Sequence, residues 1–380
     1  MTKAAELAKM GEVLTNGQIG GRRNMIINGA MQVAQRSASV TGIGAADGYF
    51  TVDRFATAFS GTAGRLTMSQ TAITDLPGFQ KCIKLDCTTA DTSIAAGEFA
   101  LLQYKFEGQD VQGLKKNTSE AEPFTVSFYV KGNANATYTL EVKDNTNGRN
   151  NSQNFNVTTS WNRISLTFAA DTDDTQSLIN NDNTLEFFLM FWLHAGTTYT
   201  GGTFVGNTWR DQVQNLRSGA TTSFFDSTDR EFFITGLQME VGSQSTPFEH
   251  RSFGEEFDLC LRYYEKSSAY GVDEDSTAGA NIYGVVGMAG SASSVGNNDA
   301  AMIHWQKSKR VAPTLVFYDA AGNSGKLSYA EAGVGRVDNI AIRSSNIGVN
   351  RSRIGTAGAS GLDAGEAVEM LFQYTADSEL

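Results

Sequence analysis

The side chains that most often bind metals or catalyse reactions are few and scattered in this chain. The three histidines, His194, His250 and His304, lie far apart, and none has the spacing typical of metal ligands. No GxSxG, HExxH or phosphate-binding glycine loop occurs. We therefore expect each histidine to be a packed or surface residue, and the sequence predicts no catalytic residue, metal site or cofactor.

Acidic residues gather in polar stretches, at Asp173-Asp174 and at Asp273-Glu274-Asp275. A glycosidase needs two carboxylates at a set separation, which the sequence alone does not exclude. Asp171, together with Asp173 and Asp174, could hold Ca²⁺, but the full loop pattern of oxygen ligands is missing. Solvated loop charges are the simpler interpretation, so we expect a protein that is not an enzyme.

A long stretch from Tyr199 to Ser223 has no regular pattern, and glycines interrupt it. Loops of this length in a compact domain are usually functional or disordered. A sugar stacks its apolar C–H face on Trp or Tyr, while amide groups bond its hydroxyls. Tyr199, Asn207 and Trp209 are therefore the candidate glycan-binding residues. The alternative is that Trp209 holds the loop on the core.

Composition restricts the class of protein. The 380 residues suggest two or three domains, and 39 Gly against 4 Pro, with abundant Asn, Thr and Ser, indicate turn-rich β structure. A formal net charge of −11 argues against nucleic acid as the main partner. No run of about 18 apolar residues is present, so we expect no membrane insertion.

Three cysteines, Cys82, Cys87 and Cys260, form no spaced framework. We expect free, partly buried thiols made in a reducing cytoplasm. No signal peptide is expected at the start of the chain, because Met1–Lys9 is followed by no apolar run.

Short apolar segments recur between Gly- and Asn-rich turns, which is typical of a two-sheet antiparallel sandwich. The segment Leu185–Leu193 is apolar on both faces, so we expect its second face to be covered. The predicted jelly-roll domain holds strands at 24–33, 56–58, 65–70, 82–87, 100–106, 124–130, 138–143, 153–157, 163–168, 185–193 and 232–241. Later strands are predicted at 282–288, 301–305, 314–318, 339–346 and 368–374.

The stretch from Phe232 to Glu265 divides the chain. It begins as a buried strand, with Leu237, Met239 and Val241 alternating with polar residues, and continues past Pro247 into a short helix with acidic residues at its start. Its sequence runs ITGLQMEVG, TPFEHRS and CLRYY in order.

These motifs resemble a segment of bacteriophage tail-fibre and related virion adhesion proteins, where it ends a carbohydrate-binding-module-like jelly roll. The resemblance also covers the run from Ala8 to Asn24 and segments near 309–322 and 374–380. It implies an all-β chain: an N-terminal virion-attachment segment at 1–24, a jelly-roll domain at 25–253, and a smaller β-rich C-terminal domain at 254–380.

The N-terminal segment is predicted to form a short helix over Lys3 to Leu14. Leu7, Met10 and Leu14 lie along one side of it, and so short a helix needs a partner surface. We expect these residues to attach the protein to another virion protein.

The C-terminal domain has modest hydrophobic content, and the resembled family is usually three-fold, so we expect a homotrimer. The function that the resemblance implies is a short trimeric tail fibre, assembled in the host cytoplasm, that attaches the virion to a host-surface glycan. A head fibre or capsid decoration protein is the alternative, and a polysaccharide depolymerase is a third.

Overall fold

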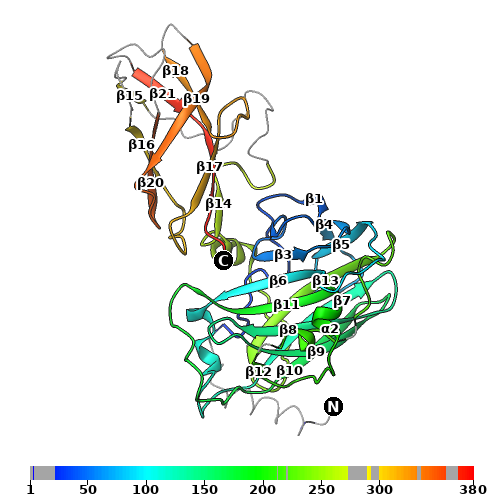
Figure 1. The fold of residues 1–380 in the computed structure, drawn as a ribbon. Coiled ribbons are helices and arrows are strands. Elements are labelled where there is room, and N and C mark those ends of the chain that lie inside the picture. The colour runs from blue at the N-terminus through cyan, green and yellow to red at the C-terminus, as the bar shows by residue number, and fades with distance from the viewer. Residues whose placement is uncertain are drawn as a thin grey trace. The chain divides into compact units, whose positions relative to one another are not determined.

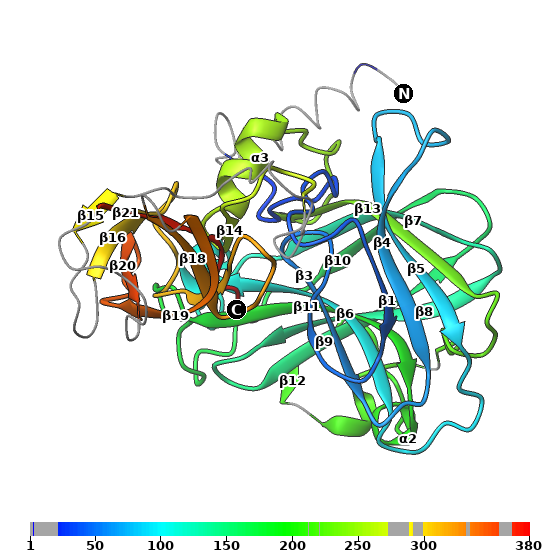
Figure 2. The same ribbon diagram turned by 90° about the horizontal axis from the view of Figure 1, so that it is seen from above.

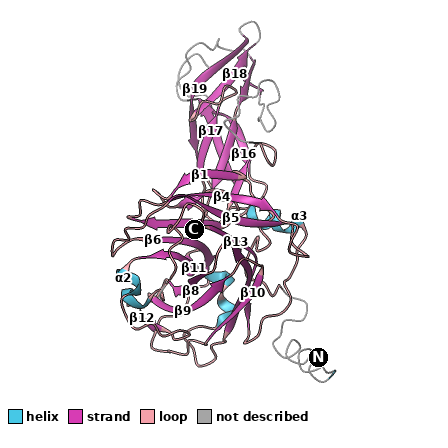
Figure 3. Ribbon diagram, turned by 90° about the vertical axis from the view of Figure 1, so that its right-hand side faces the viewer, coloured by secondary structure: helices cyan, strands magenta, loops and turns pink. Residues whose placement is uncertain are grey.

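The computed structural model describes residue 3 and residues 22–211, 213–219, 221–272, 289–291, 299–331, 335–356 and 367–380. The chain divides into two compact units. The first comprises residues up to Ala34, Ala38–Phe253 and Leu380, and the second comprises Gln35–Ser37 and Gly254–Glu379. Figure 3 shows that strands dominate both units, and within the described ranges no helix is long and apolar enough to cross a membrane.

The first unit is an antiparallel sandwich of two sheets, shown in Figure 1 and in the turned view of Figure 2. The six-stranded sheet has the order β1 (Ser39–Ile43), β4 (Arg65–Ala72), β5 (Lys81–Thr89), β13 (Glu231–Val241), β7 (Phe124–Gly132) and β10 (Asn162–Phe168). The seven-stranded sheet has the order β12 (Arg210–Asp211), β9 (Arg149–Val157), β8 (Ala136–Asp144), β11 (Leu185–Ala195), β6 (Phe99–Glu107), β3 (Phe55–Ser60) and β2 (Gly48–Tyr49). The prediction of an all-β jelly-roll sandwich is confirmed.

Alternation along the strands builds one large core between the sheets. Phe124, Val126, Phe128 and Val130 of β7 are buried in it, because successive side chains of a strand point to opposite faces. Aromatic rings from both sheets meet edge to face there; Phe128, for example, lies 5.2 Å between ring centroids from Phe191 of β11. Such pairs add to the stabilisation from area burial alone.

Strand β13 joins β5 to β7 in the middle of its sheet, as the buried pattern of 232–241 predicts. Its pairing with β7 is interrupted between Thr235 and Gln238, where Gly236 has a φ of 62°. A Cβ at Gly236 would lie 2.8 Å from the ring of Phe79 and 2.9 Å from that of Tyr129. Only glycine fits this bulge, for both conformational and steric reasons.

The segment 24–33 is not the strand that its apolar residues predict. It forms a turn in which Asn28 and Met31 have positive φ values of 62° and 57°. The Asn28 side chain fixes this turn: its amide nitrogen donates to the Val33 carbonyl, and its oxygen accepts from the Val33 amide. Local side-chain bonding of this kind competes with a strand ladder, and it prevails here.

Hydrogen bonds between distant segments close the first unit. Asn24 accepts a hydrogen bond from the Met239 amide and donates one to the Leu237 carbonyl, so the chain start lies along β13. Glu249 in turn accepts from the amides of Arg23 and Asn24, at 2.7 and 2.9 Å. The motif residues that carry the family resemblance therefore act, in part, to bind the two ends of this unit together.

A second set of contacts shapes the turn after β13. The buried carboxylate of Glu240 accepts from the amide and the hydroxyl of Thr246, at 2.8 and 2.7 Å. Gln238 donates to Glu240 and accepts from the Glu249 amide, each at 2.8 Å. The Gln-x-Glu and Thr-Pro-Phe-Glu parts of the motif thus pair with each other.

The helices are short. From residue 22 onward, the helices among the described residues are η1 (Gly108–Asp110), η2 (Gln112–Leu114), α2 (Thr197–Thr200), η3 (Gln214–Leu216) and α3 (Phe253–Cys260). Helix α3 carries Glu255 and Glu256 in its first turn and confirms the helix predicted after Pro247. The predicted helix over Lys3 to Leu14, with Leu7, Met10 and Leu14, lies outside the described residues apart from Lys3.

The second unit contains two antiparallel sheets. One has the order β14 (Tyr264–Lys266), β22 (Gln373–Asp377) and β17 (Thr314–Tyr318). The other has the order β15 (Ala289–Ser291), β21 (Ala367–Leu371), β18 (Lys326–Glu331), β19 (Gly335–Ser345), β20 (Arg351–Thr356) and β16 (Asp299–His304). The strand predicted at 282–288 lies outside the described residues.

A buried ion pair organises the start of the second unit. Lys309 and Glu265 have fully buried side chains, and their Nζ and Oε2 atoms lie 2.7 Å apart. The hydroxyl of Tyr374 donates to the other oxygen of Glu265 at 3.1 Å, and the amide of Gln306 also donates to this carboxylate. Since removing one partner of such a pair leaves an uncompensated charge, these residues must fold together.

Candidate ligand-binding site

A cavity of about 400 Å³ lies where η1 and η2 approach the connection between β10 and β11. Val111 and Ile179 are buried in its wall, and Leu178 stands at the opening with 61% of its surface exposed. Polar side chains complete the lining: Gln112, Lys115, Lys116, Thr118 and Glu120. The cavity combines an aliphatic surface with a polar rim and has a volume suited to a small ligand.

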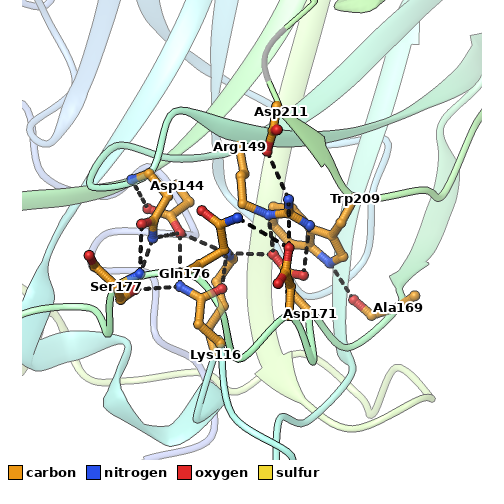
Figure 4. A network of polar contacts seen from close by, with 12 residues as sticks. Lys116, Asp144, Arg149, Ala169, Asp171, Gln176, Ser177, Trp209 and Asp211 are labelled. Atoms are coloured by element: carbon orange, nitrogen blue, oxygen red, sulfur yellow. Dashed lines mark hydrogen bonds and ion pairs between the residues drawn. The ribbon is translucent and has the colours of Figure 1, made fainter.

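Lys116 forms the inner boundary of this cavity and belongs to a buried polar network (Figure 4). Its Nζ lies 2.7 Å from Asp144 Oδ2, 2.7 Å from Asp171 Oδ2 and 2.9 Å from Asn117 Oδ1. Its three N–H groups therefore match three acceptors, and the ammonium also lies 4.5 Å from the ring centre of Trp209. The Lys116 head group is thus held by protein contacts, and the side chain as a whole is buried, with 2% of its surface exposed.

A second cation fixes Asp171 from the other side. Arg149 donates through Nε and Nη2 to the two Asp171 oxygens, at 2.9 and 3.0 Å, and through Nη1 to Asp211 at 2.9 Å (Figure 4). The same Nη1 lies 3.2 Å from Asp173. Asp171 and Asp173 therefore bind side-chain cations, and the calcium alternative considered for Asp171, Asp173 and Asp174 finds no support in these contacts.

The surroundings of Asp144 favour its ionised form and lower its pKa. Burial on its own would raise the pKa of Asp144, but the charge of Lys116 and hydrogen bonds from Asn147 and Lys116 outweigh it and lower that pKa. A general acid for glycoside hydrolysis requires the opposite shift. The pair Asp144 and Asp171 can thus hold a cation and shape the cavity.

Trp209 lies close to this network, but it faces the core. Its ring is half-buried against Phe124 and Phe187, at 6.5 and 6.4 Å between centroids, and its Nε1 donates to the Ala169 carbonyl at 2.6 Å. Asn207 is exposed, yet its side-chain oxygen accepts from the Ala169 amide at 2.9 Å. Both residues bind the loop to the end of β10, which agrees with the structural alternative for Trp209.

Tyr199 lies elsewhere, on the outer face of the seven-stranded sheet. Its ring packs on Trp192 at 5.0 Å and on Phe99 at 5.5 Å, in a small cluster separate from the main core. The structure therefore brings Asn207 and Trp209 together at Ala169 and places Tyr199 apart. Glycan binding by these three residues stays a prediction.

The long loop covers the outer face of β8 and β11. Arg217 donates to both oxygens of buried Glu141 at 2.9 and 3.0 Å and stacks 4.9 Å from the Trp192 ring centre, while Trp192 Nε1 donates to Glu141 at 2.8 Å. Within the described part of the loop, Ser218 also donates its amide to the Tyr199 carbonyl. The prediction that the second face of 185–193 is covered is confirmed.

Sequence patterns did not reveal the cavity or its network. Its charged members, Lys116, Asp144, Arg149 and Asp171, are spread over 56 positions and sit on separate strands and turns. Each looks like an ordinary surface charge in the sequence. In the structure, Lys115 and Asn117, which flank Lys116, have positive φ values of 46° and 63°. This unusual backbone conformation was not predicted from the sequence.

Comparisons with known proteins give structural similarity only. No protein-family model and no curated protein matches the chain. A solved structure described as "CBM4 structure and function" aligns with a TM-score of 0.30 and 10% identity, over 56% of this chain and 97% of that one. A family 61 carbohydrate-binding module in complex with β-1,4-galactotriose aligns at 0.29 and 9%, over 58% and 99%.

The enzymatically active domain of tailspike protein 4 from bacteriophage CBA120 aligns with a TM-score of 0.29 and 11% identity, over 57% of this chain and 21% of that one. These similarities are weak, and they concern the fold alone. The first unit is an antiparallel jelly-roll sandwich whose solved structural neighbours include carbohydrate-binding modules and this tailspike domain.

Proposed function

We propose that the protein is a non-enzymatic adhesion protein of a bacteriophage particle, which binds a glycan of the host surface through the cavity beside Lys116. The virion assignment is supported by the resemblance of the 232–264 motifs to tail-fibre and related adhesion proteins. The observation that carries ligand binding is the cavity itself, an aliphatic surface with a polar rim at one end of a rigid sandwich.

The chemistry of the cavity suits a sugar. The apolar C–H face of a pyranose would lie on Leu178 and Ile179, while Lys115 and Glu120 at the rim would bond its hydroxyls. Each hydroxyl bond replaces one to water, so a single site binds weakly. Several copies on one particle raise the avidity without any new contact.

A binding role agrees with the charges at the site. The pKa of Asp144 is lowered, which disfavours a role as general acid, and Asp171 is bonded by both Lys116 and Arg149. A depolymerase would need a raised pKa on one member of a carboxylate pair. Measured release of reducing sugar from host polysaccharide would overturn the non-enzymatic part of the proposal.

Leu178→Asp tests the binding site directly. Leu178 is largely exposed, so this change should leave folding intact while it places a charge where the sugar face would pack. Val205→Asp is the matched control, since Val205 is also exposed at 51% and does not line the cavity. We expect Leu178→Asp to reduce binding to host cells or to purified host polysaccharide by about tenfold, and Val205→Asp to bind like the parent.

Equal binding by both variants and the parent would contradict the assignment of the cavity. Binding by the parent to protein-stripped cells, or to polysaccharide alone, separates glycan from a protein receptor. A folded parent that binds neither cells nor polysaccharide would contradict the adhesion function as a whole.

Trimer formation is the second part of the proposal. The described core of the second unit is small, with nine buried hydrophobic residues against a much larger set in the first unit. A domain with so small a core often completes it across a symmetry interface. Light scattering should give about three times 40.9 kDa, and a stable monomer at micromolar concentration would contradict this.

The position on the particle distinguishes a tail fibre from a head fibre or decoration protein. We propose the tail, with attachment through residues 1–24, including Leu7, Met10 and Leu14. Electron microscopy of particles that carry a labelled copy would locate the protein, and a label on the head would favour the alternative.

A further inference from the structure

Three ionisable side chains of the first unit meet where β6 begins and β11 ends. The cavity lies at the other end of these two strands. Asp91 follows β5, Glu98 immediately precedes β6, and His194 is near the end of β11. One ligand atom from each lies within 4.8 Å of the other two. The exposed fractions of these residues are 7%, 8% and 0%, so the group is buried inside the sandwich.

A bulge turns His194 toward the interior. The pairing of β11 with β6 shifts between Trp192, opposite Leu101, and His194, opposite Ala100. Directly opposite residues of an antiparallel pair point to the same face. Trp192 and Leu101 belong to the outer cluster, whereas Ala100 belongs to the main core, so the extra residue directs His194 inward.

Two polar atoms of the group have no hydrogen-bond partner among the described residues. They are Nε2 of His194 and Oε2 of Glu98, and they face each other at 3.5 Å. This separation is longer than a good N–H···O bond, which is about 2.7–3.2 Å. It is close to the spacing of about 3.3 Å between two ligands of one tetrahedral zinc ion, each about 2 Å from the metal.

The surroundings support a ligand role for the imidazole. Nδ1 of His194 lies 2.8 Å from the Ser223 hydroxyl, whose oxygen also accepts from the Phe225 amide at 3.1 Å. A hydroxyl oxygen has two lone pairs, so it can accept from both donors. A proton on Nδ1 leaves the Nε2 lone pair for a metal, and an outer hydrogen bond of this kind orients many metal-bound histidines.

The charges of the group also need a cation. Asp91 Oδ2 accepts from the Thr62 hydroxyl and the Ala63 amide, both at 2.8 Å, and these two donors orient the carboxylate. Among the described residues, His194 is the one ion-pair partner of Glu98, and no Lys or Arg pairs with either carboxylate.

We propose that Asp91, Glu98 and His194 bind a divalent transition-metal ion of the zinc type, with a structural role. The imidazole nitrogen selects against Ca²⁺ and Mg²⁺, which prefer oxygen ligands. Two carboxylates and a neutral imidazole balance the charge of such an ion. The metal would link the β5–β6 connection, which carries Asp91 and Glu98, to the end of β11, which carries His194, so its effect is on the stability of this end of the sandwich.

The parent chain without an affinity tag, stripped with a chelator and dialysed, is the protein to test. Isothermal titration with Zn²⁺ and elemental analysis should show about one ion per chain. His194→Gln should weaken binding about 100-fold and Glu98→Gln about tenfold to 100-fold. His304→Gln is the matched control, since His304 is an exposed histidine of the second unit, and it should bind like the parent.

Zn²⁺ at about a hundredfold excess over its Kd should raise the melting temperature of the parent by roughly 5–10 °C. Absence of stoichiometric uptake by the folded parent, or equal uptake by His194→Gln, would overturn the proposal. If His194→Gln fails to fold, Co²⁺ binding measured by visible absorption replaces it as the test. A cobalt absorption spectrum in the parent that is lost in Glu98→Gln supports the site, and a parent that binds no Co²⁺ refutes it.

Discussion

Replacement of Trp209 by alanine should destabilise the first unit, because this side chain contacts the protein through three kinds of interaction. Its ring packs on Phe124 and Phe187, its Nε1 donates to Ala169, and its face receives the ammonium of Lys116. Each of these contacts is lost in Trp209→Ala. Trp209→Phe is the matched variant, since it keeps an aromatic ring and removes only the N–H group and part of the surface.

The magnitude follows from these contacts. Loss of about 100 Å² of buried apolar surface, for a ring that is half-buried, costs about 2.5 kcal/mol at 25 cal/mol per Å². The hydrogen bond and the cation–π contact add about 1 kcal/mol together after exchange with water. We expect a total of about 3–4 kcal/mol for Trp209→Ala and about 1 kcal/mol for Trp209→Phe.

Differential scanning calorimetry measures this loss. The transition of the first unit should fall by roughly 6–15 °C in Trp209→Ala, and by a few degrees in Trp209→Phe. Host-cell adsorption by the folded fraction should stay near that of the parent. If Trp209→Ala melts within about 2 °C of the parent and has lost adsorption, the structural assignment is refuted, and Trp209 contacts the receptor.

Two further predictions follow from the buried groups. The pKa of Asp144 is lowered in the folded state, so its stabilising effect is present above its unfolded pKa of about 3.9 and is lost as the pH falls through the folded value. Asp144→Asn should therefore flatten the acid limb of a stability–pH profile measured by urea unfolding. It should also lower the free energy of unfolding at pH 7 by about 3–5 kcal/mol, because buried Lys116 loses a charged partner. An unchanged acid limb would contradict this prediction. Burial raises the pKa of Cys82 to about 12 and that of Cys87 to about 11, so both thiols should resist alkylation at pH 8 until the chain is denatured, and rapid labelling of the native protein would refute it.

The fold class was accessible from the sequence because alternation is a local signal. The strands at Phe124–Val130 and Arg163–Phe168 keep one face apolar, and their predicted positions agree with β7 and β10. The doubly apolar segment at 185–193 even indicated a covered outer face. Strands β1, β2 and β12 of the first unit were missed, since short edge strands leave no periodic pattern. In the second unit β14, β15, β18 and β20 were missed as well.

The site was accessible only in part. Trp209 was singled out by residue type, but whether its ring faces solvent or core depends on Phe124 and Phe187, which are far away in sequence. The same limit applies to the segment 24–33, where the apolar run predicts a strand and the Asn28 side chain fixes a turn. Residue type indicates what a side chain can do, and long-range packing decides what it does.

The clamp between the two ends of the first unit has a mechanical consequence. The chain enters at Arg23 and Asn24 and leaves near Glu249 and Arg251, and these residues are bonded to one another. A pull between an anchor before residue 23 and the chain after residue 251 therefore loads this short clamp first. Tension applied across the first unit can therefore pass through the clamp while both sheets of the sandwich, and the cavity at their end, keep their shape.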